Sequence, residues 1–282
     1  MNIYLDCIPC FIRQALDAAR LATDEQDIQE QVLRDALCLA ADVDMTLSPP
    51  AIAQQIHRRI RSIVGSEDPY FEMKQRFNRL AMEIFSELES DIAESANPLE
   101  TAMRLAIAGN IIDCGVKSSI PEKEIRKVIN ESLTADFEAG ELDNFRRDVA
   151  NAESILYLTD NAGEIVFDKL LIEQLPTEKI TVAVRGFPVI NDATMEDAEF
   201  AGLTDMVKVI DNGSDGPGTI LDTCSDEFLD CFNAASLVIA KGQGNYESLS
   251  DVDKDIFFIL KVKCPVIASD IGCEVGKMIL KR

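Results

Sequence analysis

The chain has 282 residues, of which 47% are hydrophobic, and this is enough for one large or two modest domains. Its 27 Lys and Arg stand against 50 Asp and Glu, so the net charge is −23. Such a surface repels nucleic acids and anionic membranes, and we expect neither as a partner. Most of these carboxylates are expected to form a solvated surface, and a few to bind divalent cations.

The start of the chain and its cysteines predict a cytoplasmic protein. Met1–Cys10 lacks the basic segment of a secretory signal, and no run of 18 apolar residues is present. The eight cysteines are scattered, which favours a reducing compartment over a disulfide scaffold. The one histidine, His57, lies beside three arginines and is expected on a helix surface. A single histidine makes a histidine metal site or catalytic triad a poor fit.

The first half of the chain is predicted to be helical. Ser48-Pro49-Pro50 is typical of a helix start, and Gly65 of a helix end. The expected helices cover residues 12–21, 24–41, 49–64, 70–94, 98–110, 121–133 and 142–152. We assign residues 1–152 to a helical domain, and whether it divides near residue 95 stays open.

The second half of the chain has a different sequence pattern. Short apolar runs rich in β-branched residues alternate with helical stretches, at 154–158, 180–184, 206–210, 235–240 and 265–268. This alternation is typical of a mainly parallel sheet covered on both faces. The predicted fold class is therefore α/β, with a helical N-terminal domain and a Rossmann-like α/β/α domain over residues 153–282. Ligands of such sheets bind at the carboxyl ends of the strands.

Two of these strand ends carry paired oxygen ligands. Asp160 and Asn161 follow the first run, and Asn191 and Asp192 follow the second. Neighbouring strands lie about 5 Å apart, so one hard cation can reach both tips. Each pair alone also fits an Asx turn with a helix cap, but the two together favour a metal site.

Lysines accompany two other apolar runs. Lys241 follows the fourth run and precedes two glycines, and lysine can bind phosphate as a point charge. Its spacing is not that of a P-loop. Lys263 is expected just before the fifth run, where a solvated charge pair is the simpler interpretation.

Several motifs in chain order resemble the damage-control metal-dependent phosphatases, a family first described as a domain of unknown function. The motifs are Cys7-Ile-Pro-Cys10, Gly109-Asn110-Ile-Ile-Asp113, Asp160-Asn161-Ala-Gly163-Glu164, Arg185 to Thr194, Lys241-Gly-Gln-Gly-Asn245-Tyr-Glu247, and Lys263. The CxxC motif is similar to that of the prokaryotic-type subgroup. Related subgroups act on sugar phosphates or damaged phospho-metabolites.

The resemblance implies a role for each motif residue. The implied metal ligands are Asp160, Asn161 and Asp192, and the implied catalytic residues are Asp160 and Lys263. Substrate contacts are implied for Glu164, Asn110, Asp113, Arg185, Lys241, Asn245, Glu247 and Lys263. The implied cofactor is a divalent metal (Mg, Mn, Co or Ni), and the partner is a small phosphorylated substrate.

Several alternatives stay open at the level of sequence. The nucleophile is either the Asp160 carboxylate or water. One competing function is an S-adenosylmethionine-dependent carboxyl methyltransferase, although the turn after the first run has one glycine, Gly163, where such enzymes are glycine-rich. Another is a noncatalytic metal- or nucleotide-binding module. Cys7 and Cys10 have the spacing of half a zinc site, a redox dithiol or a structural pair. The sequence does not predict the oligomeric state.

Overall fold

The computed structural model describes residues 1–112, 122–135, 137–138 and 140–282. The first half is helical, as predicted. Its helices are α1 (Cys7–Ala22), α2 (Gln26–Ala41), α3 (Pro49–Val64), α4 (Phe71–Glu94), α5 (Pro98–Ile112), α6 (Glu122–Thr134) and α7 (Leu142–Asn151). Helix α3 begins with two prolines and ends at Gly65, whose φ of +73° is strained for residues with a side chain.

Seven strands form one sheet in the described part of the chain. They are β1 (Phe137–Glu138), β2 (Ile155–Leu158), β3 (Ile180–Val184), β4 (Lys208–Asp211), β5 (Leu237–Lys241), β6 (Ile256–Lys261) and β7 (Met278–Lys281), in the order β1-β7-β6-β5-β2-β3-β4. Strands β2 to β6 run parallel, and β7 pairs with β6 in the opposite direction. The α/β class predicted from the sequence is confirmed.

Helices and alternating strand residues build a layered core. The helices of this half are α8 (Glu164–Ile172), α9 (Met195–Phe200), α10 (Asp226–Ala234), α11 (Gly242–Leu249) and α12 (Pro265–Ile271). Ile155 and Tyr157 pack on one face with α4, α5, α7 and α8, whereas Leu156 and Leu158 pack on the other with α10, α11 and α12.

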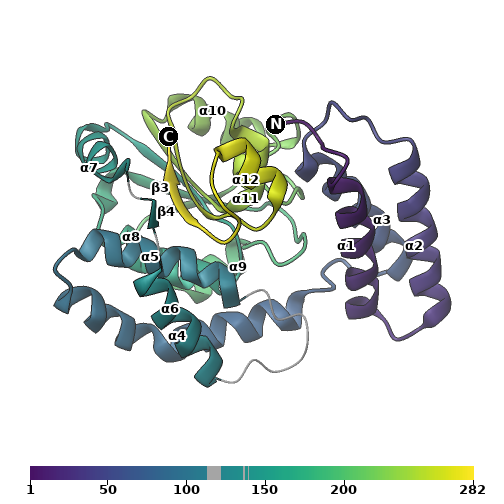
Figure 1. Cartoon of the computed structure of the whole chain (residues 1–282), viewed down its shortest axis with the longest axis horizontal. Coiled ribbons are helices and arrows are strands. Elements are labelled where there is room, and N and C mark those ends of the chain that lie inside the picture. Colours follow the sequence, from purple (N-terminus) through teal and green to yellow (C-terminus); the bar gives the residue numbers. More distant parts are fainter. Residues whose placement is uncertain (113–121, 136, 139) are drawn as a thin grey trace.

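Helices α1, α2 and α3 have an apolar cluster of their own and lie together beside the sheet (Figure 1). The larger core joins α4 and α5 to the sheet, so it continues across residue 152. The domain boundary expected there stays a prediction. None of the described helices is long and apolar enough to cross a membrane.

One predicted strand is wrong. Residues 265–268 open helix α12, because Pro265 lacks an amide donor and has the φ angle of a first helical turn. The strand in this part of the chain is β6, which precedes α12 and whose residues Ile256 to Leu260 are all buried. Lys263 therefore follows a strand instead of preceding one, which brings it to the carboxyl edge of the sheet.

The surface position expected for His57 is also wrong. The side chain is only 3% exposed and its ring centroid lies 6.1 Å from that of Tyr70. Successive helix residues point about 100° apart, so the arginines beside His57 can face solvent while it faces inward. Burial, with a smaller contribution from Arg61, lowers the pKa of His57 to about 3.

Candidate active site

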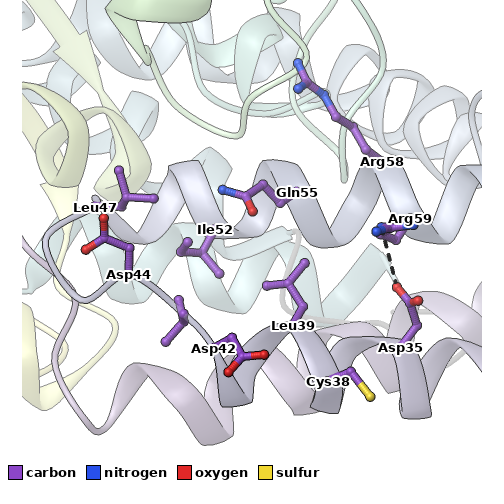
Figure 2. A pocket seen from close by; sticks show the side chains of 11 residues that line it. Asp35, Cys38, Leu39, Asp42, Asp44, Leu47, Ile52, Gln55, Arg58 and Arg59 are labelled. Atoms are coloured by element: carbon purple, nitrogen blue, oxygen red, sulfur yellow. Dashed lines mark ion pairs between the residues drawn. The ribbon is translucent and has the colours of Figure 1, made fainter.

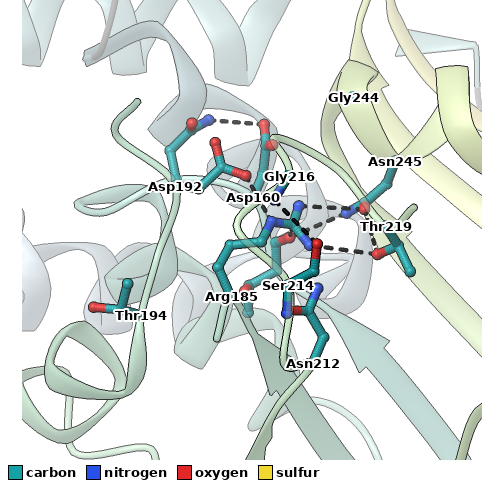
Figure 3. A network of polar contacts seen from close by, with 12 residues as sticks. Asp160, Arg185, Asp192, Thr194, Asn212, Ser214, Gly216, Thr219, Gly244 and Asn245 are labelled. Atoms are coloured by element: carbon teal, nitrogen blue, oxygen red, sulfur yellow. Dashed lines mark hydrogen bonds and ion pairs between the residues drawn. The ribbon is translucent and has the colours of Figure 1, made fainter. Parts of the chain in front are cut away.

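The loops that follow β2 and β3 run side by side. Asn161 and Asp192 form an isolated antiparallel bridge, and the Ala193 amide donates to the Asp160 carbonyl over 2.8 Å. Figure 3 shows Asp160 and Asp192 on facing loops at the carboxyl edge of the sheet. The tertiary structure thus brings the three residues implied as metal ligands together.

These three side chains are buried beside a further carboxylate. The exposed fractions are 8% for Asp160, 5% for Asn161 and 4% for Asp192. Asn161 Nδ2 donates to Asp160 Oδ2 over 2.7 Å and to Glu164 Oε2 over 3.0 Å. Burial, followed by the charges of Glu164 and Asp192, raises the pKa of Asp160 well above its ordinary value. So many buried carboxylates favour the binding of a cation.

The donor types gathered here are those that hard divalent cations accept. Two carboxylates and an amide oxygen are ligands that Mg²⁺ and similar ions accept, with water and substrate completing the shell. Among the described residues, no group of three Asp, Glu, His or Cys side chains is placed to hold a metal ion by itself, so the amide of Asn161 is needed in the donor set. Gly242, the first residue of α11, lies directly against the site, since a Cβ there would lie 2.0 Å from Asp160 Oδ2.

Arg185 and Asn245 make hydrogen bonds that support the loops after β2 and β3. Arg185 Nε donates to Asp192 Oδ2 over 2.7 Å, and its Nη2 donates to Asn245 Oδ1 over 3.3 Å. Asn245 is fully buried, and its Nδ2 donates to the Lys241 carbonyl over 2.7 Å. Both side chains therefore bind other protein groups, and these hydrogen bonds fix the positions of the two loops.

Lys241 and Glu164 form a buried ion pair next to the loops after β2 and β3. Lys241 is fully buried and Glu164 is 1% exposed, and the two pair over 2.7 Å. Lys241 also pairs with Asp168 on α8. Both were implied as substrate contacts, and the structure places both inside the protein.

Lys263 is an exposed cation near the site. Its backbone amide donates to Gln243 Oε1 over 3.1 Å, which fixes the loop after β6 against α11. Its positive charge lowers the pKa of Asp160, against the larger effect of burial. Glu247 accepts from the same Gln243, and burial raises its pKa to about 7.

The CxxC motif also lies close to this loop. Cys7 and Cys10 are near enough to Cys264 and Glu247 for their charges to interact. No disulfide joins any of the cysteines in the part of the chain that the structure describes. Burial raises the pKa of Cys7 and Cys10, which disfavours the reactive thiolate form.

The motif near the end of α5 has a packing role at Gly109. A Cβ there would lie 2.5 Å from Phe167 Cδ2, so glycine allows α5 to approach α8 closely. The structure describes only the backbone of Asn110, and Asp113 lies outside the described residues. Their implied substrate contacts stay predictions.

Helix α4 contributes a brace that the sequence analysis missed. Asn78 Oδ1 accepts from the Gly163 amide over 2.6 Å, and its Nδ2 donates to Asp197 Oδ1 over 2.7 Å. Lys74, one turn earlier, pairs with Asp197 over 3.0 Å. Polar residues on an otherwise apolar helix face are the signal that points to this role.

The whole chain is similar to known proteins. Residues 3–279 match the damage-control phosphatase ARMT1-like domain. The chain belongs to this family. An Archaeoglobus fulgidus damage-control phosphatase is 36% identical over 287 residues, covering 100% of this chain and 99% of the relative. An uncharacterized Methanocaldococcus jannaschii protein is 37% identical, covering 100% and 96%.

A solved structure supports the membership of this ARMT1-like family. The crystal structure of a DUF89 family protein from Pyrococcus horikoshii superimposes with a TM-score of 0.90 at 32% identity. The superposition covers 100% of this chain and 99% of that chain.

Proposed function

We propose that this ARMT1-like chain is a metal-dependent phosphatase that hydrolyses a small phosphorylated metabolite, either a sugar phosphate or a damaged phospho-metabolite. The convergence of Asp160, Asn161 and Asp192 at the carboxyl edge of the sheet carries the proposal. The names of two relatives, from Archaeoglobus fulgidus and Pyrococcus horikoshii, support it, because both are damage-control phosphatases.

The divalent cation would be Mg, Mn, Co or Ni, and when bound it would offset the charge of the phosphoryl group. Arg185 would keep Asp192 turned toward the cation through their 2.7 Å ion pair. Lys263, the exposed cation near Asp160, would contact the phosphoryl oxygens as their charge develops in the transition state. Asp160 is the candidate nucleophile if a carboxylate attacks phosphorus.

Positive charge at the site must overcome the repulsion between the negatively charged protein and an anionic substrate. The net charge of −23 repels a phosphorylated substrate at long range. The bound cation and Lys263 would reverse the sign of the field inside the site. A small substrate suits this arrangement, because the whole molecule can lie inside the site, where the bound cation and Lys263 would make the local potential positive.

The competing functions predict different behaviour. A methyltransferase would bind S-adenosylmethionine tightly without metal. Yet the loop after β2 has a single glycine, Gly163, where such enzymes are glycine-rich, and Asp160 lies directly against Gly242. A noncatalytic module would bind metal without turnover.

Metal-dependent hydrolysis is the first test. Protein stripped of metal is assayed on p-nitrophenyl phosphate and a panel of sugar and cofactor phosphates, with each of the four metals added back. We expect turnover only with metal. Asp192→Asn should lose at least about a hundredfold in metal affinity and activity, since supporting residues alone cost 10–100-fold.

The matched control is Asp211→Asn, an exposed carboxylate at the end of β4 that should change neither quantity. Metal binding without turnover on the whole panel would favour the noncatalytic module. Tight S-adenosylmethionine binding by the stripped protein would favour the methyltransferase.

A further inference from the structure

Lys241 ends β5 and is a buried cation with all its donors engaged. Its ammonium lies 3.0 Å from the Ala106 carbonyl, 2.7 Å from Glu164 Oε1 and 2.5 Å from Asp168 Oδ1. An ammonium has three N–H donors, and these acceptors use all of them. The geometry leaves no donor for the phosphate contact that the family resemblance implies.

Glu164 connects Lys241 to Asn161 in the loop after β2. Its Oε1 accepts from Lys241, and its Oε2 accepts from Asn161 Nδ2 over 3.0 Å. The same nitrogen donates to Asp160 Oδ2. Two carboxylate oxygens next to one amide group require the nitrogen to face them, because an amide oxygen there would be repelled.

We propose that Lys241 is a positioning residue: through Glu164 it turns the Asn161 side chain so that Oδ1 faces the metal. This inference rests on the proposed function, because it assigns Asn161 as a ligand. Supporting residues of this kind orient metal ligands and typically change metal affinity 10–100-fold when they are removed.

The surroundings of Lys241 explain how it is held. Asp168 Oδ1 accepts from the Tyr157 hydroxyl over 2.8 Å as well as from Lys241. The Asp168, Lys241 and Tyr157 side chains are fully buried, and Glu164 is nearly so. A fixed carboxylate on each side therefore sets the position of the ammonium.

The test variant must keep the buried charge. Removing Lys241 alone would leave Glu164 and Asp168 buried without a counter-charge, and such a protein can fail to fold. The double variant Lys241→Met/Asp168→Asn keeps this cluster at a net charge of −1, as in the natural protein. It removes the anchor of Glu164 without changing the local charge balance.

Mn²⁺ affinity is measured by calorimetry on metal-stripped protein whose folding is verified by circular dichroism. We expect the double variant to bind Mn²⁺ 10–100-fold more weakly than the natural protein. At saturating Mn²⁺ its affinity for inorganic phosphate should stay within about twofold. The matched control is Lys208→Met, which removes an exposed lysine from β4 and should change neither affinity.

A double-mutant cycle tests the path through Glu164. If Lys241 acts through Glu164, adding Glu164→Gln to the double variant should cost little further Mn²⁺ affinity. Fully additive losses would overturn the path. Unchanged Mn²⁺ affinity with weakened phosphate binding would instead make Lys241 a phosphate contact.

The outcome separates this inference from the proposed function. If the natural protein binds none of Mg²⁺, Mn²⁺, Co²⁺ and Ni²⁺, both fail. If the natural protein and the folded double variant bind Mn²⁺ equally, the positioning role of Lys241 fails and the proposed function stands.

Discussion

Lys263 carries the clearest prediction at the scale of single residues, because it is an exposed cation whose charge acts on Asp160. Lys263→Ala should lower kcat/KM by roughly 10²–10³, or ~3–4 kcal/mol, which is typical of losing one electrostatic stabiliser. Metal affinity should not change. Lys263→Arg should restore activity only in part, since a guanidinium is not a compact charge.

Steady-state kinetics at saturating metal, with calorimetry for metal affinity, measure both effects. Lys261→Ala is the matched control, because that lysine belongs to the end of β6 in the same segment. An unchanged kcat/KM in Lys263→Ala would return this residue to a solvated surface role.

His57 is the residue whose ionisation should affect stability most directly. It is buried, its Nε2 makes no hydrogen bond within the described residues, and its pKa is lowered to about 3. The unfolded chain takes up the proton near pH 6.5, so the folded state loses stability as pH falls from 6.5 toward 3. The loss should reach roughly 2–3 kcal/mol by pH 4.5.

The variant His57→Gln removes this titration. Its free energy of unfolding in urea is compared with that of the natural protein at pH 7 and pH 4.5. The difference between the two proteins should shift by roughly 2–3 kcal/mol in favour of the variant at the lower pH. An equal difference at both values would show that His57 is protonated in the folded state.

At the scale of elements, the first turn of α1 carries the CxxC motif beside the Lys263 loop. A mechanism built on metal and oxygen ligands does not use the thiols, and the raised pKa of both thiols disfavours the reactive thiolate form. Replacing Cys7 and Cys10 by Ser should leave kcat within about tenfold, equal to ~1.4 kcal/mol. Cys38→Ser, at an exposed cysteine of α2, is the control.

Two results would contradict this expectation. A loss above about a thousandfold in a folded double variant would give the thiols a part in the chemistry. Stoichiometric zinc in the purified protein, lost on mutation, would favour a structural metal site instead.

At the scale of the whole molecule, Asp215 connects the α1–α3 group to the sheet. Arg58 and Arg61 of α3 both donate to its carboxylate, and Gln54 donates over 2.7 Å. A cavity of about 610 Å³ lies along α2 and α3, and Arg58 and Cys38 are among the residues that line it. In Figure 2 the Arg58 side chain points away from Cys38. The segment after Asp215 continues to Thr219, which contacts Arg185.

Asp215→Asn should loosen this connection. Losing charged hydrogen bonds of partly buried groups should cost about 1–3 kcal/mol of unfolding free energy. Hydrogen exchange should rise in α3 before it rises in the sheet. Asp222→Asn, at an exposed carboxylate nearby in the chain, should change neither. Unchanged exchange in α3 would mean that apolar packing alone holds the group.

Local sequence patterns determined most of the fold. Helix starts at Pro49 and Pro98, the stop at Gly65 and the buried run at β2 are local signals, and the structure has those elements. The error at residues 265–268 arose because a short apolar run fits a strand and a buried helix equally well. Its neighbour β6 was missed for the same reason.

The sequence by itself determined which residues are polar at the strand ends, and the motifs implied Asp160, Asn161 and Asp192. Only the tertiary structure decided the directions of the side chains. The family resemblance implied a substrate contact for both Lys241 and Lys263, yet Lys241 is buried and paired with two carboxylates, whereas Lys263 is exposed. Burial depends on which helix covers a strand, and that contact is made by residues more than a hundred positions away, as in Lys241 and Ala106.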